Sequence, residues 1–217
     1  MATAEDVRAG LAAAADSGDA VFLQRFFKTG PREYGEGDVF IGVRVPATRS
    51  VVRRFRGLPP AGLDYDEIDE LLDSPVHEHR LAGALLLVAR YPKDPDTVFD
   101  RYLAAVRRGR INNWDLVDSS SEFIVGEHLR DRDRGLLDEL AASGSLWQRR
   151  VAVLATFAFI KHGDPSTTFA LAERLLTDRE DLMHKAVGWM LREVGKRVSR
   201  EQLAGFLDAH AAAMPRT

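Results

Sequence analysis

Apolar residues recur at steps of three and four along almost the whole chain, a spacing that places them on one face of an α-helix. The segments 81–88 and 151–158 are the clearest examples. Glycine and proline separate such segments, as at Gly57 and at the Tyr91–Pro92 step, where the residue before proline resists the helical conformation. The pattern predicts an all-α protein.

The predicted helices follow a weak repeat. Long apolar helices are expected to begin near Pro75, Asn113, Leu146 and Asp181, each followed by a second helix, so that the starts are 33 to 38 residues apart. This spacing is typical of two-helix repeats of the TPR, HEAT or armadillo kind, whose equivalent helices line one concave surface. We therefore expect a curved α-solenoid of HEAT-like two-helix repeats, forming a single domain over residues 1–217.

The stretch 29–45, TGPREYGEGDVFIGVRV, interrupts this pattern with four glycines and no helical period. It predicts an insertion that is either a long loop or a short β-hairpin in which Val39 to Val43 pair locally. Loops of this length inside compact domains are usually functional or disordered.

Composition narrows the classes of function. Of the 217 residues 45% are hydrophobic, which is typical of an ordered globular protein, and none is cysteine, which excludes disulfides, thiolate nucleophiles and cysteine-type zinc sites. The segment MATAEDVRAG has no basic stretch followed by an apolar run, so no secretory signal is expected. The longest apolar stretch, Leu81 to Ala89, is shorter than the ~20 residues of a membrane helix.

The formal net charge is −3, which taken alone argues against nucleic acid as a partner. The charges are segregated, however. Arginine pairs occur at 53–54, 107–108 and 149–150, and acidic residues gather in 64–70. A surface polarised in this way can bind phosphates although the molecule is acidic overall.

The segment NWDLVD, residues 113–118, carries the most informative candidates. Trp114 and Asp118 are four residues apart and share a helical face, whereas Leu116 and Val117 point more towards the core. An exposed tryptophan beside a carboxylate indicates a functional surface, because tryptophan is usually buried. The alternative is that Trp114 packs in the core and Asp118 caps a helix or pairs with an arginine.

Two later segments also begin proposed repeats. Residues 146–152 contain Arg149 and Arg150, which can equally be solvated arginines at a helix start. Residues 184–193 contain Gly188, which costs a helix ~1 kcal/mol relative to alanine and therefore suggests close packing of another helix or close approach of a ligand. The solenoid places one set of side chains on a common concave surface: Trp114, Asp118, Arg150 and Trp189.

The segments NWDLVD, WQRRVAVL and HKAVGWMLREVGK, in this order and at this separation, resemble the AlkD-type DNA alkylation repair family from about Phe26 to Val198. The resemblance implies a curved solenoid whose concave face holds duplex DNA. It also implies hydrolysis of the N-glycosidic bond of cationic N3- and N7-alkylated purines, without a tight pocket for a flipped base. One departure is Asn113, where the family commonly has an aromatic residue.

The resemblance implies the roles of four catalytic residues. Asp118 matches the aspartate that stabilises the oxocarbenium-like sugar and orients water, Trp114 and Trp189 match the sugar-contacting tryptophans, and Arg150 matches the phosphate-side arginine. No lysine falls at a nucleophile position, so a monofunctional glycosylase is expected. The residues expected to bind DNA are Arg44, Arg149, Arg150, Lys185 and Arg192.

No cofactor and no metal are expected, since His77 and His79 alternate on a helix and point to different faces. The expected partner is duplex DNA containing alkylated purines, bound by a monomer in the cytoplasm in association with the nucleoid and not with a membrane. Two alternatives remain open. One is a non-catalytic binder of branched or altered DNA on the same scaffold, with the 29–45 loop as its distinguishing feature. The other is a helical-repeat module that binds proteins.

Overall fold

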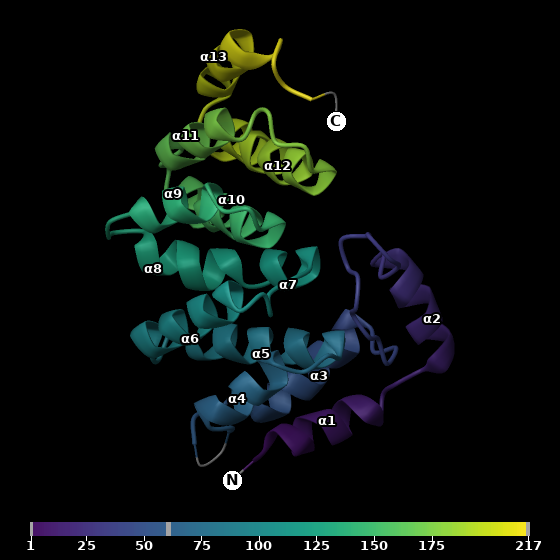
Figure 1. The fold of residues 1–217 in the computed structure, drawn as a ribbon. Coiled ribbons are helices and arrows are strands. Elements are labelled where there is room, and N and C mark those ends of the chain that lie inside the picture. Colours follow the sequence, from purple (N-terminus) through teal and green to yellow (C-terminus); the bar gives the residue numbers. More distant parts are fainter. Residues whose placement is uncertain (1, 60–61, 216–217) are drawn as a thin grey trace. The chain divides into compact units, whose positions relative to one another are not determined.

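Helices dominate the structure because the apolar positions that recur with the helical period are the positions that become buried. The structure is a computed structural model that describes residues 2–59 and 62–215. In these residues every regular element is helical apart from one isolated bridge between Val39 and Val76 (Figure 1). The predicted all-α class is confirmed.

Contacts within the chain define two units, Met1–Ser119 and Ser120–Thr217. The helices of the first unit are α1 (Ala4–Ala12), α2 (Ser17–Phe26), α3 (Val45–Phe55), α4 (Tyr65–Leu72), α5 (His77–Arg90), α6 (Pro95–Arg107) and α7 (Trp114–Asp118). Those of the second are the π-helix η1 (Glu122–Gly126), α8 (Glu127–Leu129), α9 (Gly135–Ala141), α10 (Leu146–Lys161), α11 (Ser166–Arg174), α12 (Asp181–Arg197) and α13 (Arg200–His210). The expected single domain stays a prediction.

The core of the first unit is built around α5. Every residue from Leu81 to Leu87 is buried, as is typical of a helix that is covered on all sides. Helices α1, α3, α4 and α6 pack against it. Gly83 permits the close approach of α4, because a Cβ atom there would lie 2.9 Å from the Leu72 side chain.

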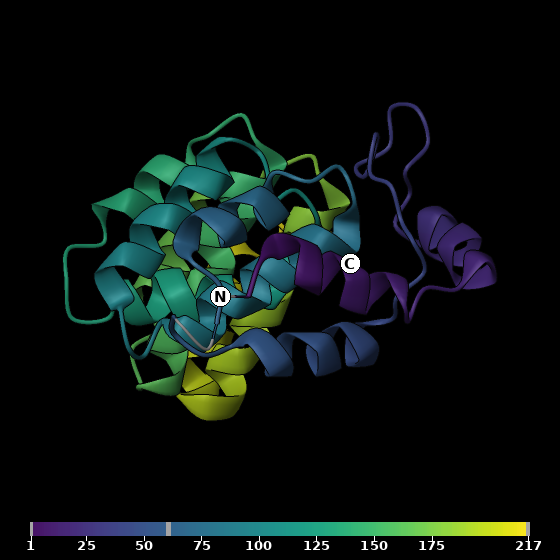
Figure 2. The same ribbon diagram turned by 90° about the horizontal axis from the view of Figure 1, so that it is seen from below.

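Helix α2 has a different character, since none of its residues is buried. Figures 1 and 2 show it standing apart from the helices α3–α6 of the same unit. Its side chains include three exposed apolar residues, Val21, Phe22 and Phe26. An apolar helix surface of this kind is available for contacts outside the unit.

The connection between α2 and α3, residues 27–44, is a loop, which was one of the two predicted alternatives; the other, a local hairpin from Val39 to Val43, does not form. Val39 pairs with the chain just before α5: its N–H donates to Pro75, and its carbonyl accepts from the His77 N–H at 2.8 Å. Gly42 has a φ of +84°, and a Cβ atom there would lie 1.9 Å from the Asp16 carbonyl oxygen. The loop is therefore packed against its own unit.

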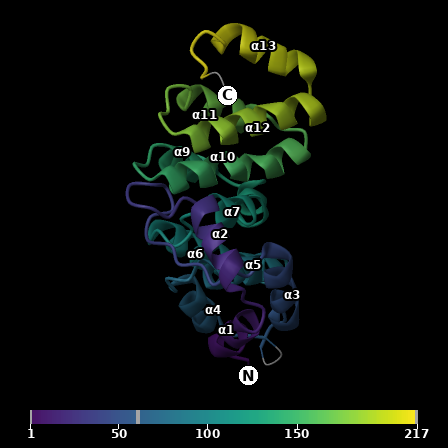
Figure 3. The same cartoon turned by 90° about the vertical axis from the view of Figure 1, so that its right-hand side faces the viewer.

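Helix α10 is the centre of the second unit. Its residues 150–156 and 158–160 are buried, and η1, α9, α11 and α12 pack against it, while α13 packs on α12. Figure 3 shows α10, α12 and α13 as successive layers of this unit. Because α10 and α12 are adjacent, their side chains form a shared surface.

The predicted helix starts agree with the structure to within two residues, at His77, Trp114, Leu146 and Asp181. The prediction of one long helix after Asn113 is wrong: α7 ends at Asp118, and a turn leads into η1. The π-helical turn brings Gly126 so close to α10 that a Cβ atom would lie 2.3 Å from the Ala155 carbonyl oxygen.

Candidate active site and nucleic-acid interface

Helix α7 carries the predicted carboxylate and one predicted tryptophan. Asn113 caps the helix, since its side-chain oxygen accepts a hydrogen bond from the backbone N–H of Trp114 at 2.9 Å. Leu116 and Val117 are fully buried, as predicted, whereas Trp114 and Asp118 are half-buried. Residues four apart share a face of a helix. The short helix therefore places an indole and a partly exposed carboxyl group next to each other.

Aromatic rings hold the Trp114 side chain. Its indole stacks on Phe27, with ring centroids 5.0 Å apart and planes inclined by 12°, and Phe26 meets it edge-on at 6.0 Å. Phe26 stacks on Phe22 of α2, and these two side chains are 53% and 51% exposed. An aromatic surface thus extends from Trp114 onto α2. Exposed rings of this kind can stack on nucleic-acid bases.

A buried network of charges connects α7 to α5. The His77 ring nitrogens lie 2.9 Å from a carboxylate oxygen of Asp115 and 3.2 Å from one of Asp38. Arg80 donates to the other oxygen of Asp38 at 2.5 Å. All four side chains are at most 8% exposed. The network therefore contains two acids and two bases that are shielded from water.

Proton occupancy in this network follows from its geometry. Burial lowers the pKa of His77, but the charge and hydrogen bond of Asp115 and the hydrogen bond of Asp38 outweigh it and raise the pKa to about 9. Burial raises the pKa of Asp38, but the His77 hydrogen bond and the Arg80 charge hold it below its ordinary value. At neutral pH the two cations balance the two carboxylates.

The predicted residues of the second unit lie on α10 and α12. Arg150 is buried, and its Nη1 donates to the Leu182 carbonyl at 2.5 Å. Trp189 is half-buried and packs against Phe157, with ring centroids 6.1 Å apart. Because the second unit is not placed relative to the first, the expected convergence of these side chains with those of α7 stays a prediction.

One face of α12 combines positive charge with an aromatic ring. Lys185, Trp189, Arg192 and Lys196 follow at steps of four, three and four, which places them along a single face. The first three of these line an open depression of about 420 Å³. Gly188 also lines it, and a Cβ atom there would meet nothing within 4 Å. Close helix packing therefore does not explain this glycine, and the close approach of a ligand stays a prediction.

Two other arginines predicted to bind DNA, Arg149 and Arg44, differ in how strongly the protein itself binds their side chains. The Arg149 side chain is 14% exposed and donates to Asp178 at 2.7 Å and to the carbonyls of Ser143 and Gly144. Its donors thus fix the start of α10, and its contact with DNA stays a prediction. Arg44 pairs with Asp19 on α2 while its side chain stays 59% exposed.

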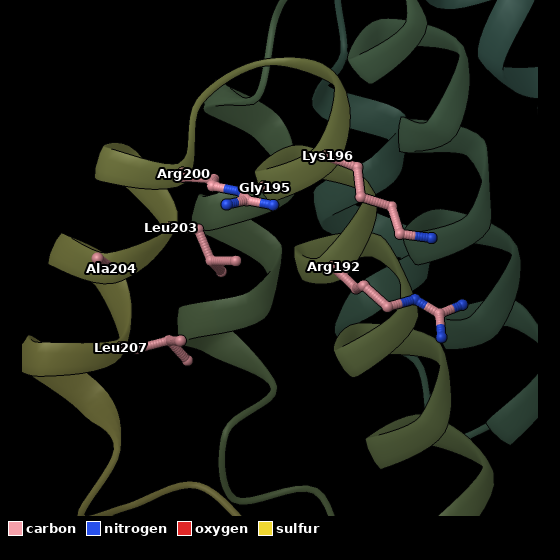
Figure 4. A pocket seen from close by; sticks show the side chains of 7 residues that line it. All are labelled: Arg192, Gly195, Lys196, Arg200, Leu203, Ala204 and Leu207. Carbon is pink, nitrogen blue, oxygen red and sulfur yellow. The ribbon is translucent and has the colours of Figure 1, made fainter.

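A second depression of about 310 Å³ lies between α12 and α13 (Figure 4). Leu203 and Leu207 extend from α13 into it, whereas Arg192 and Lys196 extend from α12 in another direction. These two cations therefore belong to the charged face of α12 and not to the apolar floor.

Some residues of the candidate nucleic-acid interface were not predicted from the sequence. On α10, Phe157 carries two cations over its ring: Lys161 at 4.5 Å and Arg197 of α12 at 5.3 Å. Two arginines of α3 and the arginine that caps its C-terminus, together called the three arginines of α3, line an open groove of about 300 Å³ with apolar residues of α3 and α5: Arg49, Arg53 and Arg56. Their spacing of four and three residues is a sequence pattern that places them on one helical face, whereas the predicted charge segregation was based on adjacent arginine pairs.

The three arginines of α3 differ from most others in the chain. No ion pair joins them to an acidic side chain in the described ranges, 2–59 and 62–215. Their guanidinium groups are therefore available to anions outside the protein. This is the charge distribution expected of a phosphate-binding surface.

The histidines of the segment His77-Glu78-His79 point in different directions, as predicted. His77 faces Asp38 and Asp115, whereas Nδ1 of His79 lies 2.9 Å from the Ser74 hydroxyl. Among the described residues, no group of three or more histidine, cysteine, aspartate or glutamate side chains is arranged to hold a metal ion. No helix in the same ranges is long and apolar enough to cross a membrane.

The described residues form an all-helical fold with unpaired arginines and with an aromatic site beside a carboxylate, features that suit a helical protein acting on nucleic acid. A family model described as DNA alkylation repair enzyme matches residues 7–217. The protein therefore belongs to the DNA alkylation repair enzyme family, which supports a role in DNA repair. The comparison with curated proteins gives no match.

Proposed function

We propose that this protein is a monofunctional DNA glycosylase that hydrolyses the N-glycosidic bond of cationic N3- or N7-alkylated purines in duplex DNA. The observation that carries the proposal is a partly exposed Asp118 one helical turn from a stacked Trp114, in a member of this repair family. The proposed scaffold is a curved solenoid of HEAT-like repeats that acts as a monomer on nucleoid DNA in the cytoplasm.

The chemistry requires few groups. When the glycosidic bond breaks, its electron pair moves to the purine nitrogen and neutralises the positive charge of the alkylated base, so the base leaves without a general acid. Positive charge develops on the deoxyribose, as in other glycoside hydrolyses. A carboxylate fixed beside the sugar stabilises that charge and orients a water molecule, whose oxygen bonds to the anomeric carbon while one of its O–H bonds breaks and the proton passes to the carboxylate. In the proposal this carboxylate is Asp118.

The other residues bind the nucleotide. Trp114 and Trp189 stabilise the cationic sugar by cation–π attraction, on the order of 1 kcal/mol each. The family resemblance assigns Arg150 to a phosphate. The arginines of α3 and the cations of α12 are suited to phosphates further along the duplex, because phosphate contacts supply most of the affinity for DNA. Recognition by charge and backbone, without a tight base pocket, predicts tolerance of bulky adducts.

A base-release assay tests the proposal. Wild-type protein should release 3-methyladenine or 7-methylguanine from methylated duplex, and Asp118→Asn should lower the single-turnover rate by a factor of about 100 or more, with little change in affinity for DNA. Asp100→Asn, at an exposed position on α6, is the matched control and should retain the wild-type rate. Absence of released base from wild-type protein, or full activity of Asp118→Asn, contradicts the proposal.

A second candidate function is non-catalytic binding of branched or altered DNA. The exposed aromatic surface of α2 favours it, since unpaired bases at a junction can stack on Phe22 and Phe26. This function predicts tighter binding to forked DNA than to duplex, and a loss of that preference in the Phe22→Ser, Phe26→Ser double variant. Equal affinity of wild-type protein for forked and duplex DNA contradicts it.

A further inference from the structure

The buried pair His77 and Asp38 takes no part in the chemistry described above. We propose that these two side chains are positioning residues, which act through Asp115 and a stack of rings to hold Trp114 and Asp118 in their working orientation. The inference rests on the proposed function, because it assigns the pair to the site of that reaction.

The first connection consists of hydrogen bonds. Asp115 lies between Trp114 and Asp118 in the chain, and its side chain points inward. One carboxylate oxygen accepts from the His77 ring at 2.9 Å, and the other accepts from the backbone N–H of Leu116 at 2.9 Å. The same carboxylate therefore binds α5 and the first turn of α7.

The second connection is a continuous stack of rings. Trp114 stacks on Phe27, Phe27 stacks on Phe40 with centroids 5.0 Å apart, and Phe40 stacks on His77 with centroids 4.4 Å apart. His77 is thus linked to the α7 backbone through Asp115 and to the Trp114 indole through two phenyl rings. A movement of the His77 ring disturbs both links at once.

The third connection passes through Asp38 in the 27–44 loop. Its carboxylate accepts from the side-chain amides of Asn112 and Asn113 at 3.1 and 3.3 Å, as well as from His77. These two residues directly precede Trp114 and include the cap of α7. Asp38 thereby fixes the entrance to α7 from the opposite side of the His77 ring.

Helix α7 needs such supports because it has only five residues. Helices below about 12 residues are marginally stable by themselves, so the direction of α7 is determined by its tertiary contacts. Displacement of a catalytic group by about 1 Å can lower a rate by a factor of about 100. A network that holds α7 at its start therefore affects catalysis without touching DNA.

The experiment compares His77→Gln and Asp38→Asn with His79→Gln. His79 is on the same helix and contacts Ser74, away from α7, so its variant is the matched control. In folded His77→Gln and Asp38→Asn, single-turnover base release should fall by about tenfold or more, while the Kd for undamaged duplex stays at the wild-type value. His79→Gln should match the wild type in both measurements.

Each outcome has a distinct meaning. Wild-type rates in folded His77→Gln and Asp38→Asn overturn the positioning role, whereas a wild-type protein that releases no base overturns the proposed function. If the wild-type protein releases no base, the inference is tested by tryptophan fluorescence. The chain has three tryptophans, so replacing Trp147 and Trp189 with phenylalanine leaves Trp114 as the only source of this fluorescence. His77→Gln should then increase quenching of Trp114 by acrylamide, and unchanged quenching overturns the inference. Asp38→Asn replaces His77→Gln in this measurement if the latter does not fold.

Discussion

Gly188 lies in the middle of α12, at a place where no other part of the described structure fills the space beside it. Apart from the neighbouring backbone of its own helix, no atom of the described residues lies within 4 Å of the position of its missing Cβ, and it lines the depression beside Trp189. A mid-helix glycine lowers the stability of the folded protein by ~1 kcal/mol relative to alanine. Because no neighbouring helix in the described part of the chain packs against Gly188, no packing contact offsets this cost. We therefore assign the glycine to the approach of a DNA backbone.

Gly188→Ala should accordingly raise the free energy of unfolding by up to ~1 kcal/mol, as measured by urea denaturation. Gly188→Leu should leave the fold intact but weaken binding to duplex DNA, because its side chain fills the depression. Gly205 on α13 is the matched control, since it is exposed and its Cβ would also meet no atom. Equal affinity of Gly188→Leu and Gly205→Leu for DNA would refute the assignment.

His77 and His79 respond to pH in opposite directions. The pKa of His77 is raised to about 9 from 6.5 because Asp115 and Asp38 outweigh its burial, so its contribution to stability is present below pH 6.5 and is lost as the pH rises through 9. Burial lowers the pKa of His79 to about 4, so its contribution is present above pH 6.5 and is lost as the pH falls through 4.

The unfolding free energy of the wild type should therefore decrease on both sides of neutrality. His77→Gln should remove a large part of the alkaline decrease, and His79→Gln a large part of the decrease between pH 6.5 and 4. Urea titrations from pH 4 to pH 10 measure both changes. Identical pH profiles of the two variants would show that the histidines are not the groups responsible.

At the scale of elements, the 27–44 loop is fixed by one buried acid. The Glu78 carboxylate accepts hydrogen bonds from the backbone N–H groups of Ile41, Gly42 and Val43 at 2.9–3.1 Å. Glu78 is 1% exposed, so water cannot replace these bonds. The first turn of α5 therefore determines where the loop, with Asp38 and Phe40, is held.

Glu78→Gln should lower the free energy of unfolding by on the order of 3 kcal/mol. In glutamine an NH2 group takes the place of one accepting oxygen and the negative charge is lost, so the backbone N–H donors of the loop lose hydrogen bonds. Hydrogen exchange at Ile41, Gly42 and Val43 should become faster. Glu70→Gln serves as the comparison: this acid pairs with Arg8 at the surface, 56% exposed, and its loss should change stability by less than ~1 kcal/mol. Unchanged exchange in Glu78→Gln would contradict the role of this acid.

How far the sequence predicts these elements depends on the range of the contacts that define them. The starts of α10 and α12 follow from local patterns, and they were predicted correctly. The turn into η1 depends on the contact of Gly126 with Ala155, which no local pattern reveals. Local period alone therefore predicts one long helix where the structure has several short ones.

The buried network was missed for the same reason. His77 is 39 residues from Asp38 and 38 from Asp115, and each alone resembles a solvated polar residue. The one local signal was the run His77-Glu78-His79-Arg80, which forms the first turn of a helix whose next residues are apolar, so that charged residues become buried with it. In the sequence this run resembles a possible metal site, and its alternating histidines argue against one.

For the whole molecule, net charge is a poor guide to the partner because many acids are already paired with basic side chains of the protein. In the acidic cluster on α4, Asp66 and Asp69 accept from Arg101, and Glu70 pairs with Arg8. On α12, Glu193 pairs with Lys196 and Arg197. The arginines of α3 have no such acids, so a chain with a net charge of −3 still has positive surface for phosphates.

The salt dependence of DNA binding tests this division of charges. Each phosphate contact contributes about −0.9 to the slope of log K against log salt, so replacing Arg49, Arg53 and Arg56 with glutamine should make the slope shallower by about two to three units. Arg101→Gln is the control, because its guanidinium is already bound to Asp66 and Asp69. Its slope should equal that of the wild type. If the triple variant retains the wild-type slope, the groove on α3 does not bind phosphates, and the affinity for DNA must come from other cations such as those of α12.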